Sequence, residues 1–134
     1  MRVALAHDYL VKYGGAERVL EALLDLYPSA PIYTLLYDPE AVSKRLRGAH
    51  VITSALQKKR WAHRNLNRAR PLMPYYVEQF DFRGFDVVIS SAHGFIKGII
   101  TPAETVHICY CHTPTRYLWH QADEAPRHVG RLLK

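Results

Sequence analysis

The stretch that decides the fold is RVALAHDYLVKYGGAERVLEALLDLYP, residues 2–28. Its first part, Arg2 to His7, is a short apolar run that ends in polar residues and predicts a buried β-strand. After the glycine pair, apolar residues recur on one helical face, which predicts an amphipathic helix ending at Pro28. The apolar face holds Ala16, Val19, Leu20, Leu23, Leu24 and Tyr27, and the opposite face holds Glu17, Arg18, Glu21 and Asp25.

The same alternation continues along the chain. Further strands are predicted at residues 31–38, 50–54, 85–92 and 106–112, with short helices at 40–47 and 94–100. The segment from Leu56 to Phe80 is helical in pattern, and Pro71 and Pro74 break it into at least two pieces. Near-continuous apolar strands alternating with helices predict an α/β fold, a doubly wound parallel sheet with helices on both faces.

Length and composition describe an ordinary globular domain. The 134 residues make one domain, with 49% hydrophobic and 22% charged residues. No apolar run approaches the roughly 18–20 residues of a membrane span, and Asp8 comes too early for a signal peptide. Cys109 and Cys111 lie two residues apart on one predicted strand, so a disulfide framework is not expected. A reducing, cytoplasmic setting fits these features.

The positive charge is concentrated in one segment. Of the net charge of +6, nine Lys or Arg and no Asp or Glu lie between Ala41 and Val77, so the rest of the chain carries −3. A general nucleic-acid binder assembles a basic face from several elements, so no nucleic acid is expected as a partner.

The densest part of this segment is KKRWAHRNLNRAR, residues 58–70. It is either a solvated cationic helix packed by a thin apolar seam (Trp61 or Ala62, with Leu66 and Ala69) or a surface attracted to anionic lipid headgroups or phosphates. Trp61 in a basic amphipathic helix favours a membrane surface. The candidate anion-binding residues are Lys58, Lys59, Arg60, Trp61, Arg64 and Arg68.

Ligands of such sheets bind at the carboxyl ends of the strands. Two of these ends, at residues 7–18 and 90–98, carry site candidates. The glycine pair in HDYLVKYGGAER, residues 7–18, allows a close phosphate approach, or it serves a tight turn that needs positive φ. In SSAHGFIKG, residues 90–98, Ser90, Ser91 and His93 suit a hydroxylated ligand with His93 as a base, or they are a helix cap and a satisfied loop histidine.

The last strand end is YCHTPTRYLWH, residues 110–120, where two histidines, an arginine and aromatics follow an apolar run. His107, Cys109, Cys111 and His112 suggest a metal site, but along a strand the side chain of His112 points to the opposite face from the other three, and no second pair of ligands exists elsewhere. No metal is expected, and the cysteines are expected to be buried strand residues.

Three segments together resemble a known family: residues 1–38, FDVVISSAHGFIKGII (85–100) and HICYCHTPTRYLW (107–119). They resemble the N-terminal half of GT-B glycosyltransferases of family 4, most of all bacterial sugar transferases of the mannosyltransferase type. The resemblance covers Met1 to about Trp119. It implies two Rossmann-like halves around a cleft, in which the N-terminal half holds the acceptor and the C-terminal half holds a nucleotide-diphosphate sugar.

The resemblance also implies roles for particular residues. Gly14 and Gly15 match the glycine loop that approaches the donor diphosphate. His112 matches the cleft histidine that contacts the transferred sugar or acceptor, with His93 on the neighbouring loop as a second catalytic candidate. Further cleft or acceptor candidates are Asp8, Thr113, Arg116 and Tyr117. The family needs no metal and no cofactor beyond its sugar donor.

The chain departs from the family in one respect. The donor signature of the family is a pair of glutamates eight positions apart. The glutamates of this chain are at positions 17, 21, 40, 78, 104 and 124, and no two of them are eight apart, so the signature is absent. We therefore expect an incomplete domain, residues 1–134, whose partner is a missing C-terminal donor-binding domain or a split partner chain. Alone it is expected to transfer no sugar, and to expose an apolar patch that favours self-association.

Two functions follow as expectations. The first is the acceptor-side domain of a retaining transferase that moves a mannose-like hexose to a glycan or lipid-linked acceptor, in the cytoplasm or peripherally on the inner face of the cell membrane. The second is a non-catalytic α/β module whose basic helix holds anionic lipid or nucleic acid. The first requires convergence at one sheet edge of Gly14, Gly15, His93 and His112.

Overall fold

The computed structural model describes residues 1–113, and Arg116 and Tyr117 lie outside that range. The strands are β1 (Val3–His7), β2 (Ile32–Thr34), β3 (Val51–Thr53), β4 (Val87–Ala92) and β5 (Val106–Cys111). The helices are α1 (Gly15–Leu26), α2 (Lys44–Arg47), α3 (Arg60–Arg64), α4 (Leu66–Ala69) and α5 (Met73–Glu78). Short 3-10 turns are η1 (Pro39–Ala41), η2 (Ala55–Lys58), η3 (Arg70–Leu72) and η4 (Ile96–Gly98). The predicted alternation of strands and helices is confirmed, although β2 is shorter than expected.

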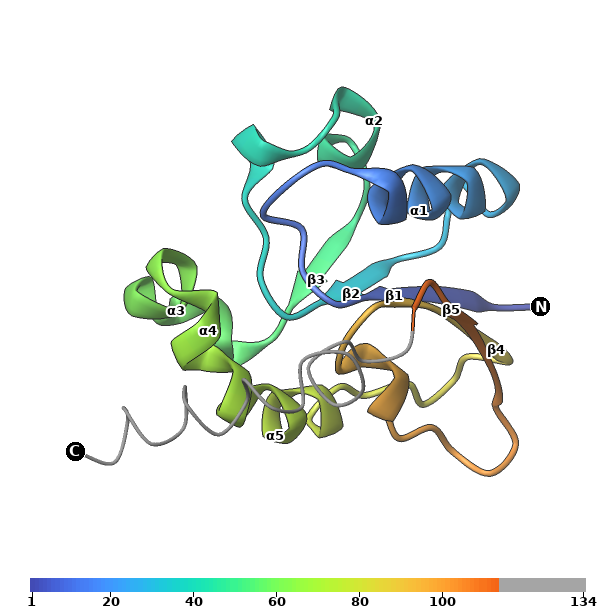
Figure 1. Cartoon of the computed structure of the whole chain (residues 1–134). Helices are drawn as coiled ribbons and strands as arrows, with labels where there is room; N and C mark the ends of the chain where they lie inside the picture. The colour runs from blue at the N-terminus through green and yellow to red at the C-terminus, as the bar shows by residue number, and fades with distance from the viewer. Residues whose placement is uncertain (114–134) are drawn as a thin grey trace.

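The five strands form one parallel sheet (Figure 1), and their order is β3-β2-β1-β4-β5. The chain builds outward from the central β1 to β3 and then crosses back to place β4 on the other side of β1. In register, His7 lies beside Thr34 on β2 and beside Ser91 on β4. The strand order therefore reverses between β1 and β4, which is where Rossmann-like sheets bind ligands.

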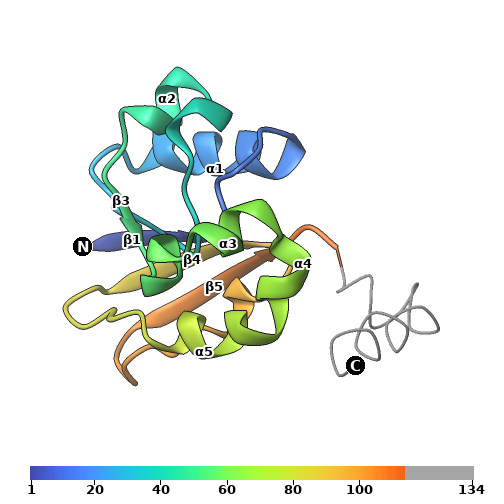
Figure 2. The same ribbon diagram turned by 90° about the vertical axis from the view of Figure 1, so that its left-hand side faces the viewer.

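Helices cover both faces of the sheet, as predicted (Figures 1 and 2). Each face has its own apolar core. Alternate residues of β1 point to opposite faces, so Leu5 packs with the α1 side and Ala6 with the α5 side. The α1 side is filled by Leu20, Leu24, Ile32 and Leu46, and the α5 side by Ala62, Ala69, Met73, Val77 and Phe82. Strand β1 is buried along its whole length.

The basic segment is a series of short helical pieces that follow one another. Asn65 ends α3 and caps α4, because its side-chain oxygen accepts a hydrogen bond from the Arg68 N–H at 3.1 Å. The expected apolar seam is present, with Ala62 and Ala69 fully buried and Leu66 packed against the same core. Trp61 does not belong to the seam, because it is 39% exposed.

Strand β5 is an edge strand, and this corrects the prediction that the cysteines are buried. Cys109 and Cys111 are both exposed, and neither forms a disulfide. The apolar side chains Val106, Ile108 and Tyr110 are between 51% and 56% exposed, so an apolar surface of the expected kind exists on this strand. Association of the chain with itself through that surface stays a prediction. None of the helices within residues 1–113 has the length and apolar character needed to cross a bilayer.

Candidate functional site

A pocket of about 500 Å³ lies where β1, β4 and β5 end and α1 begins. It brings together five residues that the sequence had singled out: Gly14, Gly15, His93, His112 and Thr113. Its remaining lining comes from Tyr9, Lys12, Ala16, Glu17, Arg70, Gly94 and Phe95. The convergence required of the glycine pair and the two histidines is therefore found at the carboxyl edge of the sheet.

The glycine pair is not explained by backbone strain. Gly84 is the positive-φ glycine within residues 1–113, and Gly14 has an extended φ of −156° that other residues also adopt. A Cβ added at Gly15 would meet no atom within 4 Å. The prediction that the pair serves a turn needing positive φ is therefore wrong. What glycine provides at position 15 is open space beside the positive N-terminal end of α1.

Asp8 lies beneath the pocket and is fully buried. Its carboxylate accepts four backbone hydrogen bonds, from the N–H groups of His93, Gly94, Phe95 and Ile96, at 2.6–2.9 Å. A Cβ at Gly94 would stand 3.0 Å from the Asp8 carboxylate, which explains glycine at that position. Asp8 therefore shapes the loop that carries His93 and is not among the residues that line the pocket.

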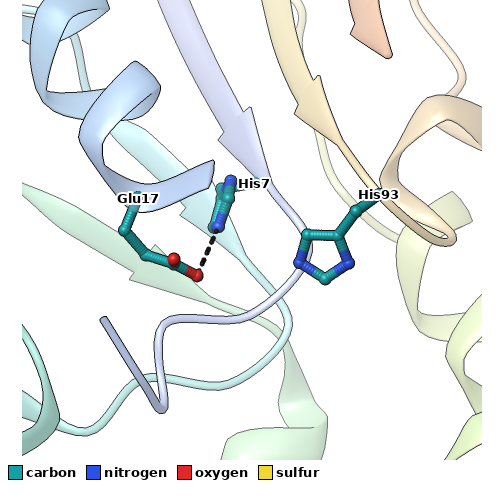
Figure 3. Close-up of side chains that lie close together, drawn as sticks. All are labelled: His7, Glu17 and His93. Atoms are coloured by element: carbon teal, nitrogen blue, oxygen red, sulfur yellow. Dashed lines mark hydrogen bonds and ion pairs between the residues drawn. The ribbon is translucent and has the colours of Figure 1, made fainter. Parts of the chain in front are cut away.

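Glu17 is a site residue that the helical pattern placed on the polar face of α1, although it is only 1% exposed. One carboxylate oxygen accepts the Gly14 N–H at 2.8 Å, and the other lies 3.3 Å from Nε2 of His7 (Figure 3). Burial raises the pKa of Glu17, but hydrogen bonds from His7 and from backbone N–H groups outweigh it and lower the pKa below its usual value. Glutamate three residues after the N-cap is the capping-box position, and that spacing was the available signal.

His7 extends this contact toward His112. Nδ1 of His7, which is fully buried, lies 3.0 Å from the Ser91 carbonyl oxygen and 3.2 Å from the Ser91 hydroxyl. The same hydroxyl lies 2.7 Å from Nε2 of His112, and the backbone N–H of His112 donates to the Ala92 carbonyl oxygen. A continuous polar chain thus runs from Glu17 on α1 through His7 on β1 and Ser91 on β4 to His112 at the end of β5.

Both pocket histidines favour the neutral form. Burial lowers the pKa of His93, against the opposing attraction of Asp8. Burial also lowers the pKa of His112, and the neighbouring His7 lowers it further. Since an unperturbed histidine titrates near pH 6.5, both rings are mainly uncharged at neutral pH. They suit hydroxyl groups, while the cations Lys12 and Arg70 in the same lining suit an anion.

His7, Glu17 and His93 each place one potential metal-ligand atom within 4.8 Å of the others (Figure 3). Both nitrogens of His7 and both oxygens of Glu17 are already engaged in hydrogen bonds. The buried Nε2 of His93 has no partner among the described residues. Lys12 and Arg70 in the pocket wall would also oppose a cation. We therefore interpret the cluster as a hydrogen-bond network, and the expectation of no metal stays a prediction.

The basic surface is a separate feature. All six of its predicted residues are exposed: Lys58, Lys59, Arg60, Trp61, Arg64 and Arg68. Arg70, from the end of the same stretch, lines the pocket instead. The sequence pattern grouped these cations as one helix face, whereas the break at Asn65 and the turn at η3 direct them to two places.

Comparison with models of protein families, with curated proteins and with solved structures gives no match. The class of protein is thus defined by geometry: a Rossmann-like parallel α/β domain with a mixed cationic and histidine-lined pocket at its switch point.

Proposed function

We propose that the chain is the acceptor-side domain of a retaining, nucleotide-sugar-dependent GT-B glycosyltransferase that moves a mannose-like hexose to a glycan or lipid-linked acceptor. The observation that carries the proposal is the meeting of Gly15, His93 and His112 in one pocket. These residues are far apart in sequence, and each lies in a segment that resembles family 4. The open space at Gly15 adds support, since a close-approaching ligand explains glycine there.

The chemistry of the pocket suits a sugar diphosphate. The N-terminal end of the twelve-residue α1 and the nearby Lys12 and Arg70 attract phosphate oxygens. The neutral His93 and His112 are placed to meet sugar hydroxyls. No metal is needed in this scheme. A C-terminal donor-binding domain or a partner chain would complete the cleft, and sugar transfer requires it.

The test is titration of the chain with nucleoside diphosphates and their hexose conjugates, at low and moderate salt, followed by calorimetry. Gly15→Ala adds a methyl group where the fold has room, so we expect an unchanged melting temperature and a loss of about tenfold or more in affinity. Lys12→Gln should weaken diphosphate binding, whereas Lys58→Gln, on the basic surface, should leave it unchanged. Binding that is equal in all three variants contradicts the proposal.

A second candidate function is attachment to an anionic lipid surface, and the exposed Trp61 among lysines and arginines favours it. Co-sedimentation with vesicles containing anionic lipid tests it. Salt-sensitive binding that falls with Trp61→Ala and persists in His112→Ala supports a peripheral position on the inner membrane face. No vesicle binding at low salt contradicts it.

A further inference from the structure

The polar chain behind His112 contains enough contacts to place its hydrogens. Nδ1 of His7 lies 3.0 Å from the Ser91 carbonyl oxygen, and a carbonyl oxygen only accepts hydrogen bonds. Nδ1 of His7 therefore carries a hydrogen. This holds whether the proton between His7 and Glu17 resides on Nε2 of His7 or on the carboxylate, because that proton lies on the other side of the ring.

The direction of the next contact follows from the first. The Ser91 hydroxyl oxygen lies 3.2 Å from the same Nδ1, and because that nitrogen carries a hydrogen, the hydroxyl can only accept there. A hydroxyl has one hydrogen, and within residues 1–113 the remaining partner of this hydroxyl is Nε2 of His112 at 2.7 Å. Ser91 therefore donates to His112. A neutral imidazole that accepts at Nε2 carries its hydrogen on Nδ1.

We propose that His7 and Ser91 are positioning residues that hold His112 in its Nδ1–H tautomer, so that His112 donates a hydrogen bond to a ligand oxygen and does not act as a base. The ligand group it fits is an acceptor oxygen, such as a sugar hydroxyl or a phosphate oxygen. The identity of that ligand rests on the function proposed above, whereas the tautomer rests on contacts within the chain alone.

The molecule provides a control pair that joins β4 to β5. Ser90 and His107 make a similar contact, with the hydroxyl 2.8 Å from Nε2. In the sheet register Ser91 lies beside His7, whereas Ser90 lies beside Ala6, which has no polar side chain. Only the Ser91 hydroxyl thus has a donor from β1 that fixes its direction.

The experiment is nitrogen-15 NMR of the imidazole rings in the ligand-free chain, which distinguishes protonated from unprotonated ring nitrogens. We expect His112 to show a protonated Nδ1 and an unprotonated Nε2. Ser91→Ala removes the donor and should shift the tautomer ratio toward Nε2–H by about fivefold, the effect of one ordinary hydrogen bond. Ser91→Thr keeps the hydroxyl and should keep the wild-type tautomer, and Ser90→Ala should change His107 and leave His112 alone.

A wild-type spectrum with the hydrogen on Nε2 of His112 overturns the proposal, and this reading needs no variant to fold. An equal response of His112 to Ser90→Ala and Ser91→Ala also overturns it. His7→Asn keeps an N–H near the Ser91 position and should preserve the tautomer better than His7→Leu. Because no ligand is added, absence of nucleotide binding would contradict the proposed function and leave this result unaffected.

Discussion

Two serine–histidine pairs join β4 to the β5 region, and they differ in what lies behind them. Ser90 meets His107 at 2.8 Å and Ser91 meets His112 at 2.7 Å, from adjacent residues that point to opposite faces of the sheet. Only the second pair borders the pocket, and only it is continued by His7 and Glu17. The two pairs make the same kind of contact between a serine and a histidine. The difference is that His7 on β1 fixes the direction of the Ser91 hydrogen bond, and only this pair reaches the pocket.

The largest expected effect is at Asp8, whose carboxylate holds the loop that follows β4. Asp8→Asn leaves one side-chain acceptor oxygen for four amide N–H groups, and we expect a loss of about 3–5 kcal/mol in the free energy of unfolding, since each orphaned buried donor costs about 1–3 kcal/mol. Urea unfolding measures it. As a control, Asp38→Asn changes a carboxylate that accepts one amide N–H at a helix start, and asparagine caps equally well.

If the two substitutions cost the same, the four hydrogen bonds to Asp8 are not what holds the His93 loop. Histidine NMR adds a second reading. Asp8→Asn should disturb the signals of His93 and His112, while those of His107, on the far face, change less.

Glu17→Gln tests the far end of the polar chain. The pKa of Glu17 is lowered, so its ionised form stabilises the fold at pH values above the ordinary pKa of 4.5. That contribution begins to fall below pH 4.5 and is lost as the pH passes through the lowered pKa of the folded state. Glutamine keeps the shape and an oxygen for the Gly14 N–H, so we expect a loss of about 1–2 kcal/mol at pH 7. Urea unfolding at pH 7 and pH 4 should show that the difference in the free energy of unfolding between the wild type and Glu17→Gln becomes smaller at pH 4.

Glu21→Gln, one turn later on α1, is the control. If the difference in the free energy of unfolding between the wild type and Glu17→Gln is the same at pH 7 and pH 4, the charge of the Glu17 carboxylate does not stabilise its contact with His7.

The polar chain also marks the limit of what the sequence could predict. Period and composition predicted the strands and the two-sided sheet. His93 and His112 were chosen as candidates because they follow strand ends, where such folds bind ligands, and both line the pocket. Glu17 was misplaced because helical periodicity assigns polar residues to the solvent face, and only its spacing from Gly14 indicated otherwise. The exposure of Cys109 depends on β5 being an edge strand, and strand order is a long-range property that no local pattern contains.

A smaller effect sharpens the comparison of the two pairs. Burial lowers the pKa of both His107 and His112, but His7 lowers the pKa of His112 as well. His7→Leu should therefore raise the pKa of His112 and leave that of His107 unchanged. An NMR pH titration of both rings measures this, and equal shifts at the two histidines would remove the distinction between the pairs.

The same pKa directions predict the acid response of stability. Histidines whose folded pKa is lowered bind protons more readily in the unfolded chain, so stability is full above about pH 6.5 and falls as the pH drops below it. His107→Gln and His112→Gln should each make that fall less steep. Unfolding curves collected between pH 7.5 and pH 5 check the slope, and a steeper fall in either variant would contradict the assigned direction.

The smallest effect is expected from metal ions, and it separates the two interpretations of His7, Glu17 and His93. A hydrogen-bond network predicts no change in melting temperature with zinc or magnesium in a background where Cys109 and Cys111 are serine. If the cluster binds a metal ion, a metal concentration of one hundred times the dissociation constant would add about 2.7 kcal/mol to the free energy of unfolding. That would raise the melting temperature by several degrees. A rise of that size that His93→Gln abolishes and the distant His63→Gln preserves would make the cluster a metal centre, and Nε2 of His7 would then have to exchange its hydrogen bond with Glu17 for a metal bond.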